Sequence, residues 1–145
     1  MSLDDLYRQV ILDHAQHPRA RGVLNGDHVI AVDLKNPTCG DHITLYVRLQ
    51  DGNVQDIRFT GEGCSISQAS ASMMTDLLKG QSVGEAERIK NIFLKMIQGE
   101  ALTEAEEEAL GDAIALKGVA QFPARIKCAT LAWKALEQGI SEQSM

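Results

Sequence analysis

Long hydrophobic runs, an excess of basic residues and an even number of cysteines are all missing from this sequence of 145 residues. No apolar run approaches the roughly 20 residues that span a bilayer, and the first residues lack the pattern of a signal peptide. We therefore expect a cytoplasmic protein with no membrane partner. A net charge of -6 argues against nucleic acid as a partner, because phosphate contacts need a basic face. Three cysteines cannot form a complete set of intramolecular disulfides, which favours metal or thiolate chemistry in a reducing compartment.

Several catalytic and low-complexity patterns are also absent. The sequence has no internal repeat, no glycine-rich phosphate loop, no GxSxG motif and no HExxH motif. Glycine and proline are too few and too scattered to indicate disorder. What is present, 44% hydrophobic and 23% charged residues, is typical of a globular protein, and the length predicts one domain over residues 1–145.

The first half of the chain predicts one helix followed by three strands. Apolar residues recur at helical spacing from Leu3, and Pro18 ends that pattern. The segments 29–35, 43–50 and 54–60 are β-branched or alternate between apolar and polar residues. Asp51-Gly52-Asn53 predicts a hairpin turn, and the change of phase after Val54 predicts a bulge before Ile57. A small antiparallel sheet is expected.

The second half predicts several helices. A glycine-rich turn opens a helix at about Ser65, which Gly80 ends. Two capping boxes, one pairing Ser82 with Glu85 and the other pairing Thr103 with Glu106, each begin a further helical segment. The last helix begins at Pro123 and is expected to end before Gly139. The predicted fold class is therefore α+β, with a three-stranded antiparallel sheet, an N-terminal helix and several C-terminal helices.

The cysteines are the residues that most need an explanation. Cys39, in the segment NPTCGD, and Cys64 both lie beside glycines in predicted turns, where a buried apolar side chain has little reason to be. Cys64 and Cys128 each lie near a predicted helix N-terminus, whose dipole favours a thiolate. Asp41 follows Cys39 by two residues and can point to the same side, so one carboxylate and three thiolates could form a tetrahedral zinc site.

Each of these residues also has a structural interpretation. Cys128 lies in an apolar helix, where a free cysteine commonly packs as a small hydrophobic residue. Asp41 could serve only as a turn residue. The histidines give no clear ligand. An ordinary role is favoured for His14 and His17, while His28 and His42 flank strands and His42 is a weak outside candidate beside Asp41. A cysteine nucleophile paired with a histidine base stays open, but no particular histidine is indicated. The four are His14, His17, His28 and His42.

With these residues in view, the chain resembles the SufU/IscU family of iron-sulfur cluster assembly proteins, also called NifU-like N-terminal domains. The similarity extends over almost the whole chain through four segments: LYRQVILDHAQHPRARG, NPTCGD, GEGCSISQASASMM and FPARIKCATLAW. The family's fold is α+β, with a three-stranded antiparallel sheet and packed helices. This agrees with the elements expected from the pattern.

Two branches of the family differ at the third cysteine. The IscU branch builds a cluster on its cysteines, has a histidine immediately before the third, and carries a Leu-Pro-Pro-Val-Lys loop. Here Lys127 precedes Cys128, that loop is absent, and the stretch between Cys64 and Cys128 is longer. The sequence is therefore similar to the SufU branch.

The resemblance implies a zinc-dependent sulfurtransferase that accepts persulfide sulfur from a SufS-like cysteine desulfurase. It implies that zinc binds Cys39, Asp41, Cys64 and Cys128, that Cys39 is the persulfide acceptor, and that Arg125 is a basic residue near the reaction, although a solvent-facing helix charge explains Arg125 almost as well. The sulfur would pass on to a downstream iron-sulfur scaffold. Two alternatives stay open: a scaffold holding iron or a [2Fe-2S] cluster on the same residues, and a non-catalytic zinc-binding interaction module.

Overall fold

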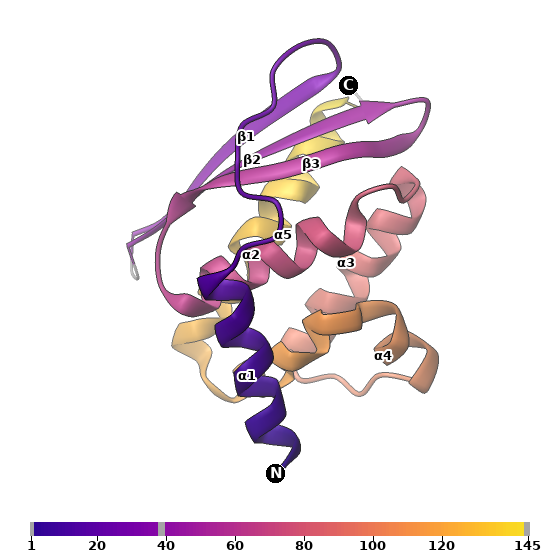
Figure 1. Ribbon diagram of the computed structural model, residues 1–145. Coiled ribbons are helices and arrows are strands. Elements are labelled where there is room, and N and C mark those ends of the chain that lie inside the picture. The colour runs from indigo at the N-terminus through magenta and orange to yellow at the C-terminus, as the bar shows by residue number, and fades with distance from the viewer. Residues whose placement is uncertain (1, 38–39, 144–145) are drawn as a thin grey trace.

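The computed structural model describes residues 2–37 and 40–143 as a three-stranded sheet with helices on one of its faces (Figure 1). The strands are β1 (Val29–Asn36), β2 (Asp41–Gln50) and β3 (Asn53–Glu62), paired antiparallel in the order β1-β2-β3. The α+β prediction, with its three antiparallel strands, is confirmed. Each strand is one to three residues longer than the pattern predicted, because pairing continues into the polar residues at the strand ends.

The β2–β3 hairpin has the predicted turn and bulge. Asp51 and Gly52 both have positive φ, of 56° and 76°, as a tight two-residue hairpin turn requires. The register then changes: Leu49 lies opposite Val54 while Arg48 lies opposite Asp56, so one residue of β3 has no partner. The bulge restores the alternation that buries Val54 and Ile57 on the same face.

The helical elements follow the sheet in the order α2 (Ser65–Leu78), α3 (Val83–Ile97), α4 (Glu104–Leu110), a 3-10 helix η1 (Gly111–Gln121) and α5 (Pro123–Gln143). The N-terminal helix α1 (Leu3–Gln16) packs against α2 and η1 rather than against the sheet. Helix α5 crosses β1 and β2, and α2 lies against β3. No helix within residues 2–37 and 40–143 is long and apolar enough to cross a membrane.

Two local predictions were wrong. Helix α5 does not end before Gly139 but continues to Gln143, because Gly139 lies where the helix approaches β1: a Cβ there would stand 3.4 Å from Val32 Cγ2. The capping box expected at α3 is only half formed. Ser82 Oγ accepts from the Glu85 backbone N–H, but the Glu85 carboxylate binds the Arg88 guanidinium instead of the Ser82 backbone. The second box, of Thr103 with Glu106, is complete.

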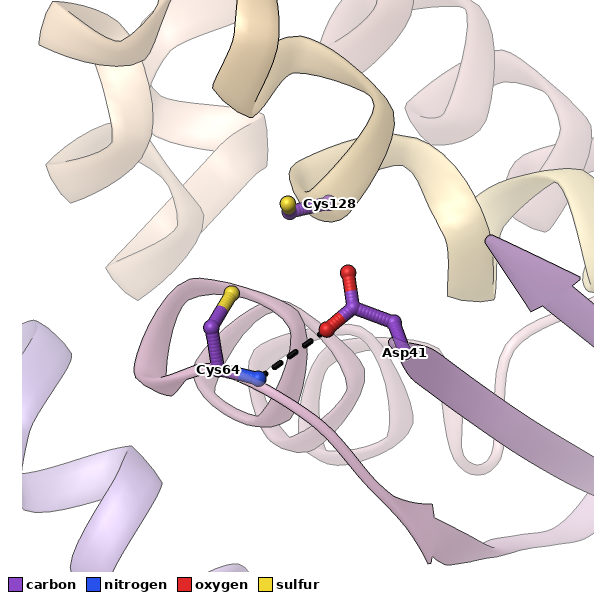
Figure 2. Close-up of side chains that lie close together, drawn as sticks. All are labelled: Asp41, Cys64 and Cys128. Atoms are coloured by element: carbon purple, nitrogen blue, oxygen red, sulfur yellow. Dashed lines mark hydrogen bonds between the residues drawn. The ribbon is translucent and has the colours of Figure 1, made fainter. Parts of the chain in front are cut away.

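The beginnings of β2, α2 and α5 meet at one end of the molecule (Figure 2). Asp41 opens β2, Cys64 is the N-cap of α2, and Cys128 lies in the second turn of α5. Three side chains that are far apart in the sequence thereby come together.

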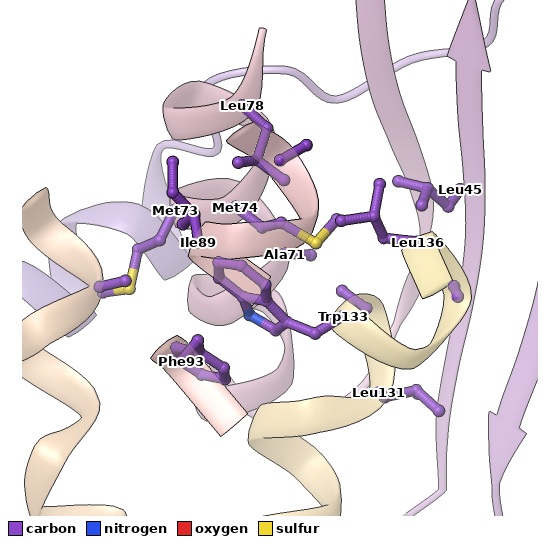
Figure 3. Close-up of a cluster of buried hydrophobic side chains, with 14 of the residues drawn as sticks. Leu45, Ala71, Met73, Met74, Leu78, Ile89, Phe93, Leu131, Trp133 and Leu136 are labelled. Atoms are coloured by element: carbon purple, nitrogen blue, oxygen red, sulfur yellow. The ribbon is translucent and has the colours of Figure 1, made fainter. Parts of the chain in front are cut away.

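Helix α5 is fixed over the sheet by a core around Trp133 (Figure 3). The indole ring stacks on Phe93 of α3, with centroids 4.2 Å apart and planes inclined by 10°. Its Nε1 donates to Ser70 Oγ at 2.9 Å, and Ser70 in turn donates to the carbonyl oxygen of Ala129. The only polar atom of this large buried side chain is thus paired, and α5 is tied to α2 through Ala129 and Trp133, soon after Cys128.

Candidate metal centre

One ligand atom from each of Asp41, Cys64 and Cys128 lies within 4.8 Å of the other two. Asp41 and Cys128 are buried, and Cys64 is partly exposed. Figure 2 shows the free oxygen of Asp41 and the two thiol groups pointing into a common space. Carboxylate oxygen and cysteine sulfur at this separation are compatible with ligation of a single zinc ion.

The Asp41 carboxylate is held on one oxygen and open on the other. Its Oδ1 accepts a hydrogen bond of 3.0 Å from the backbone N–H of Cys64, at the start of α2. Its Oδ2 is buried and has no hydrogen-bond partner in the part of the chain that the structure describes. An unpaired buried acceptor costs about 1–3 kcal/mol, and a cation beside it removes that cost. The donor set therefore fits a metal ion.

Gly63 makes the close approach of Asp41 and Cys64 possible. Its φ of 154° is in the range that favours glycine, and a Cβ at this position would collide with Asp41 Oδ1 and with Ser67 Oγ. The glycine-rich turn GEGC predicted from the sequence is thus the segment that lets α2 begin directly against the carboxylate.

Cys128 is completely buried, and its sulfur faces two polar groups. Asn36 Nδ2, at the end of β1, lies 4.0 Å from Cys128 Sγ, and so does the carbonyl oxygen of Ala124. Sequence reasoning missed Asn36 as part of the site. The sequence gives a signal only for part of this, because Asn36 opens the NPTCGD segment and pairs with Asp41 across it, while the contact with Cys128 depends on the packing of α5.

The structure says less about the other two predicted site residues, Cys39 and Arg125. Cys39 lies outside the described residues, so its part in the site stays a prediction from the sequence. Arg125 is exposed in the first turn of α5, one turn before Cys128, and its role also stays a prediction.

The histidines take ordinary roles where their contacts are described. His14 is buried: its Nε2 donates to Asp112 at 2.9 Å, and its Nδ1 shares a hydrogen bond of 2.8 Å with the Ser72 hydroxyl. His42 points away from Asp41, its neighbour on β2, and binds Asp33. That hydrogen bond, helped by one from Thr44, holds the pKa of the Asp33 carboxyl below its usual value. His17 and His28 are exposed. In the part of the chain that the structure describes, the group formed by Asp41, Cys64 and Cys128 includes no histidine.

Residues 6–129 match the family model of the NifU-like N-terminal domain. The chain belongs to this family. Among curated NifU-like relatives, the zinc-dependent sulfurtransferase SufU of Bacillus subtilis is 54% identical over 98% of this chain and 94% of that protein. The iron-sulfur cluster assembly scaffold protein IscU of Streptococcus pyogenes is 49% identical over 98% of this chain and 87% of that protein.

The fold agrees with a solved NifU-like structure, a putative iron-sulfur cluster assembly scaffold protein for the SUF system from Fervidobacterium islandicum. It superimposes with a TM-score of 0.83 at 31% identity, over 96% of this chain and 99% of that chain. The resemblance found from the four sequence segments is therefore confirmed. The relatives' names include both a sulfurtransferase and scaffolds, so the choice between these activities depends on the site residues.

Proposed function

We propose that this protein is a zinc-dependent sulfur acceptor in iron-sulfur cluster biogenesis. It takes persulfide sulfur from a SufS-like cysteine desulfurase and passes it to a downstream iron-sulfur scaffold. Zinc would be held by Cys39, Asp41, Cys64 and Cys128. When bound there, zinc would keep the cysteines in the thiolate form and protect them from oxidation.

The observation that carries this proposal is the buried Oδ2 of Asp41, which has no hydrogen-bond partner within residues 2–37 and 40–143 and lies beside two thiols. Aspartate oxygen with cysteine sulfur is a donor set suited to zinc. The name of the Bacillus subtilis relative, a zinc-dependent sulfurtransferase at 54% identity, supports the same metal and the same activity. A purely structural metal is less persuasive, because a chain of this size buries enough surface to fold without one.

The chemical step is a thiol exchange at sulfur. The thiolate of Cys39 attacks the outer sulfur of the desulfurase persulfide, and a new S–S bond forms as the old one breaks. The electron pair of the broken bond leaves with the desulfurase cysteine as a thiolate. One sulfur atom is transferred from the desulfurase cysteine to Cys39. No net oxidation or reduction occurs, and no further reactant is needed. Arg125 would stabilise the negative charge on the sulfur atoms, as a permanent cation one turn before Cys128.

A second candidate function is a scaffold on which a [2Fe-2S] cluster is assembled. The 49% identity to an IscU scaffold protein favours it, and the same residues could bind iron. Lys127 counts against it: an ammonium group precedes Cys128 where the IscU branch has a histidine, and lysine is a poorer iron ligand at neutral pH.

Metal analysis of protein purified without added iron separates these functions. We expect close to one zinc ion per chain, and no stable visible absorption after anaerobic addition of iron and sulfide. A stable coloured cluster would show the scaffold function instead. Desulfurase turnover then tests catalysis: the protein should stimulate it, and Cys39→Ala should abolish the stimulation. Zinc binding without any stimulation would leave an interaction module as the better description.

A further inference from the structure

Three lysines line one shallow depression beside the metal centre. Lys35 at the end of β1 and Lys127 and Lys134 on α5 surround a space of about 240 Å³, together with Asn36, Thr130 and Leu131. All three lysine side chains are exposed. We call these three residues the lysine patch.

The lysine patch differs from the rest of the protein's lysines in its pairing. The chain has seven lysines, and the four outside the patch each lie 3.1 to 3.9 Å from a carboxylate oxygen: Lys79, Lys90, Lys95 and Lys117. Within residues 2–37 and 40–143, no member of the patch has an ion pair with a carboxylate. Lys35 also attracts the Asp33 carboxylate at longer range, while that carboxylate is hydrogen-bonded to His42 and Thr44.

This concentration of positive charge is unusual in a chain with a net charge of -6. Three ammonium groups around one depression repel one another unless an anion lies between them. The depression also adjoins the metal centre, because Asn36 lines it and places Nδ2 4.0 Å from Cys128 Sγ. An anionic group bound here would therefore be held next to the cysteines.

We propose that the lysine patch binds an acidic segment of a protein that docks at the cysteines. Identifying that protein with the sulfur-donating desulfurase rests on the function proposed above. The open shape favours a protein segment over a small anion. Fixed backbone N–H groups and bidentate arginines give a small anion a defined geometry, whereas a lysine contributes a flexible point charge. The polar, solvent-accessible rim of a protein interface does not need a fixed geometry. The stems and Leu131 add an apolar floor for the partner's side chains.

The test compares two triple variants of equal charge. One is Lys35→Gln, Lys127→Gln and Lys134→Gln together; the other replaces three paired lysines, Lys79, Lys95 and Lys117, in the same way. Association with the desulfurase is measured by stopped flow at low and at high ionic strength. The patch variant should associate about tenfold more slowly at low ionic strength and lose most of its salt dependence, while the control should change less than about twofold. Equal slowing of both variants would overturn the proposal.

The zinc content of both triple variants is measured as a control. Both variants should bind as much zinc as the unsubstituted protein. If that protein itself fails to bind the desulfurase, the proposed function fails, and the patch is tested with an oligoglutamate peptide, an oligoglutamine control and inorganic phosphate. Lysine NMR shifts confined to the three patch residues with oligoglutamate alone support the patch. Shifts spread over all seven lysines, no shifts, or equal shifts with phosphate would each contradict it.

Discussion

At the scale of single residues, Asp41 is the side chain whose surroundings most need an explanation. It is buried at the first position of β2, its Oδ1 is bound by the Cys64 N–H, and its Oδ2 has no partner among the described residues. An aspartate so placed is expensive for the fold without a cation, since burying an unpaired charged oxygen is unfavourable. These constraints support the proposal that Asp41 is a metal ligand, with its orientation set in advance by the backbone N–H of Cys64.

Replacing Asp41 should therefore weaken metal binding more than it weakens the fold. We expect Asp41→Ala to lose zinc on dialysis against a mild chelator, while the far-ultraviolet circular dichroism stays unchanged. Metal analysis after dialysis measures the effect. Asp33→Ala, which removes an exposed carboxylate from the neighbouring strand, is the control and should keep its zinc. Full zinc retention by Asp41→Ala would remove Asp41 from the ligand set.

Gly63 offers a second test at a residue that has no side chain. Gly63→Ala should destabilise the protein by about 1–3 kcal/mol and lower its zinc content, because the new Cβ strains the backbone and displaces Asp41. Urea denaturation measures the stability. Gly84→Ala, in the first turn of α3 with open space around the new Cβ, should be neutral or slightly stabilising. Similar effects of the two substitutions would contradict the role given to Gly63.

Helices and strands differ in how well their limits could be predicted. The starts of α1, α3, α4 and α5 follow from Ser2, Ser82, Thr103 and Pro123, whose preferences are local. The end of α5 depends on the distance between Gly139 and β1, which no local pattern contains. For the same reason the 3-10 helix η1, packed between α1 and α5, was foreseen only as part of a helical region.

The capping box of α4 makes a pH-dependent contribution that can be measured. The backbone N–H of Thr103, and after it Lys95, holds the pKa of the Glu106 carboxyl below its usual value of 4.5. Because this pKa is lower in the folded state, the ionised carboxyl stabilises the protein at pH values above its ordinary pKa. This stabilisation is lost as the pH falls through the lowered pKa.

Glu106→Gln should accordingly destabilise the protein at neutral pH and make little difference in acid. Urea denaturation of both proteins at several pH values checks this. Glu104→Gln removes a charge from the same helical turn at a residue outside the box, so it is the control. A destabilisation by Glu106→Gln that does not change with pH would contradict the argument.

Across the whole molecule, the candidate metal centre lies where three segments meet, the beginnings of β2, α2 and α5. Local pattern placed Cys64 beside glycines and both Cys64 and Cys128 near helix starts, but packing in an apolar helix explained Cys128 as well, and the family resemblance was needed to imply that they share one site. The geometry of their meeting depends on how α5 packs over β1 and β2 around Trp133, which is a property of the complete core. Asn36 escaped prediction for the same reason, since its contact with Cys128 exists only after α5 is in place.

Removal of the metal should therefore loosen this end of the fold. A ligand present at about 100 times its dissociation constant stabilises the folded state by about 2.7 kcal/mol, which for a chain of this size corresponds to a fall in Tm of roughly 5–10 °C on chelation. Differential scanning calorimetry before and after chelator treatment measures the change. Readdition of zinc should restore the Tm, and an unchanged Tm would show that the centre carries no metal in the purified protein.

The cysteine that receives the transferred sulfur is the central feature of the proposed function. The zinc-loaded protein is incubated with the cysteine desulfurase and L-cysteine, digested without reductant, and mapped by mass spectrometry. We predict that one additional sulfur atom is found on the peptide containing Cys39, and that it is absent when Cys39→Ala is used. Sulfur on Cys64 or Cys128 with Cys39 unmodified, or no added sulfur on any cysteine, would contradict the assignment of this protein as a sulfur acceptor through Cys39.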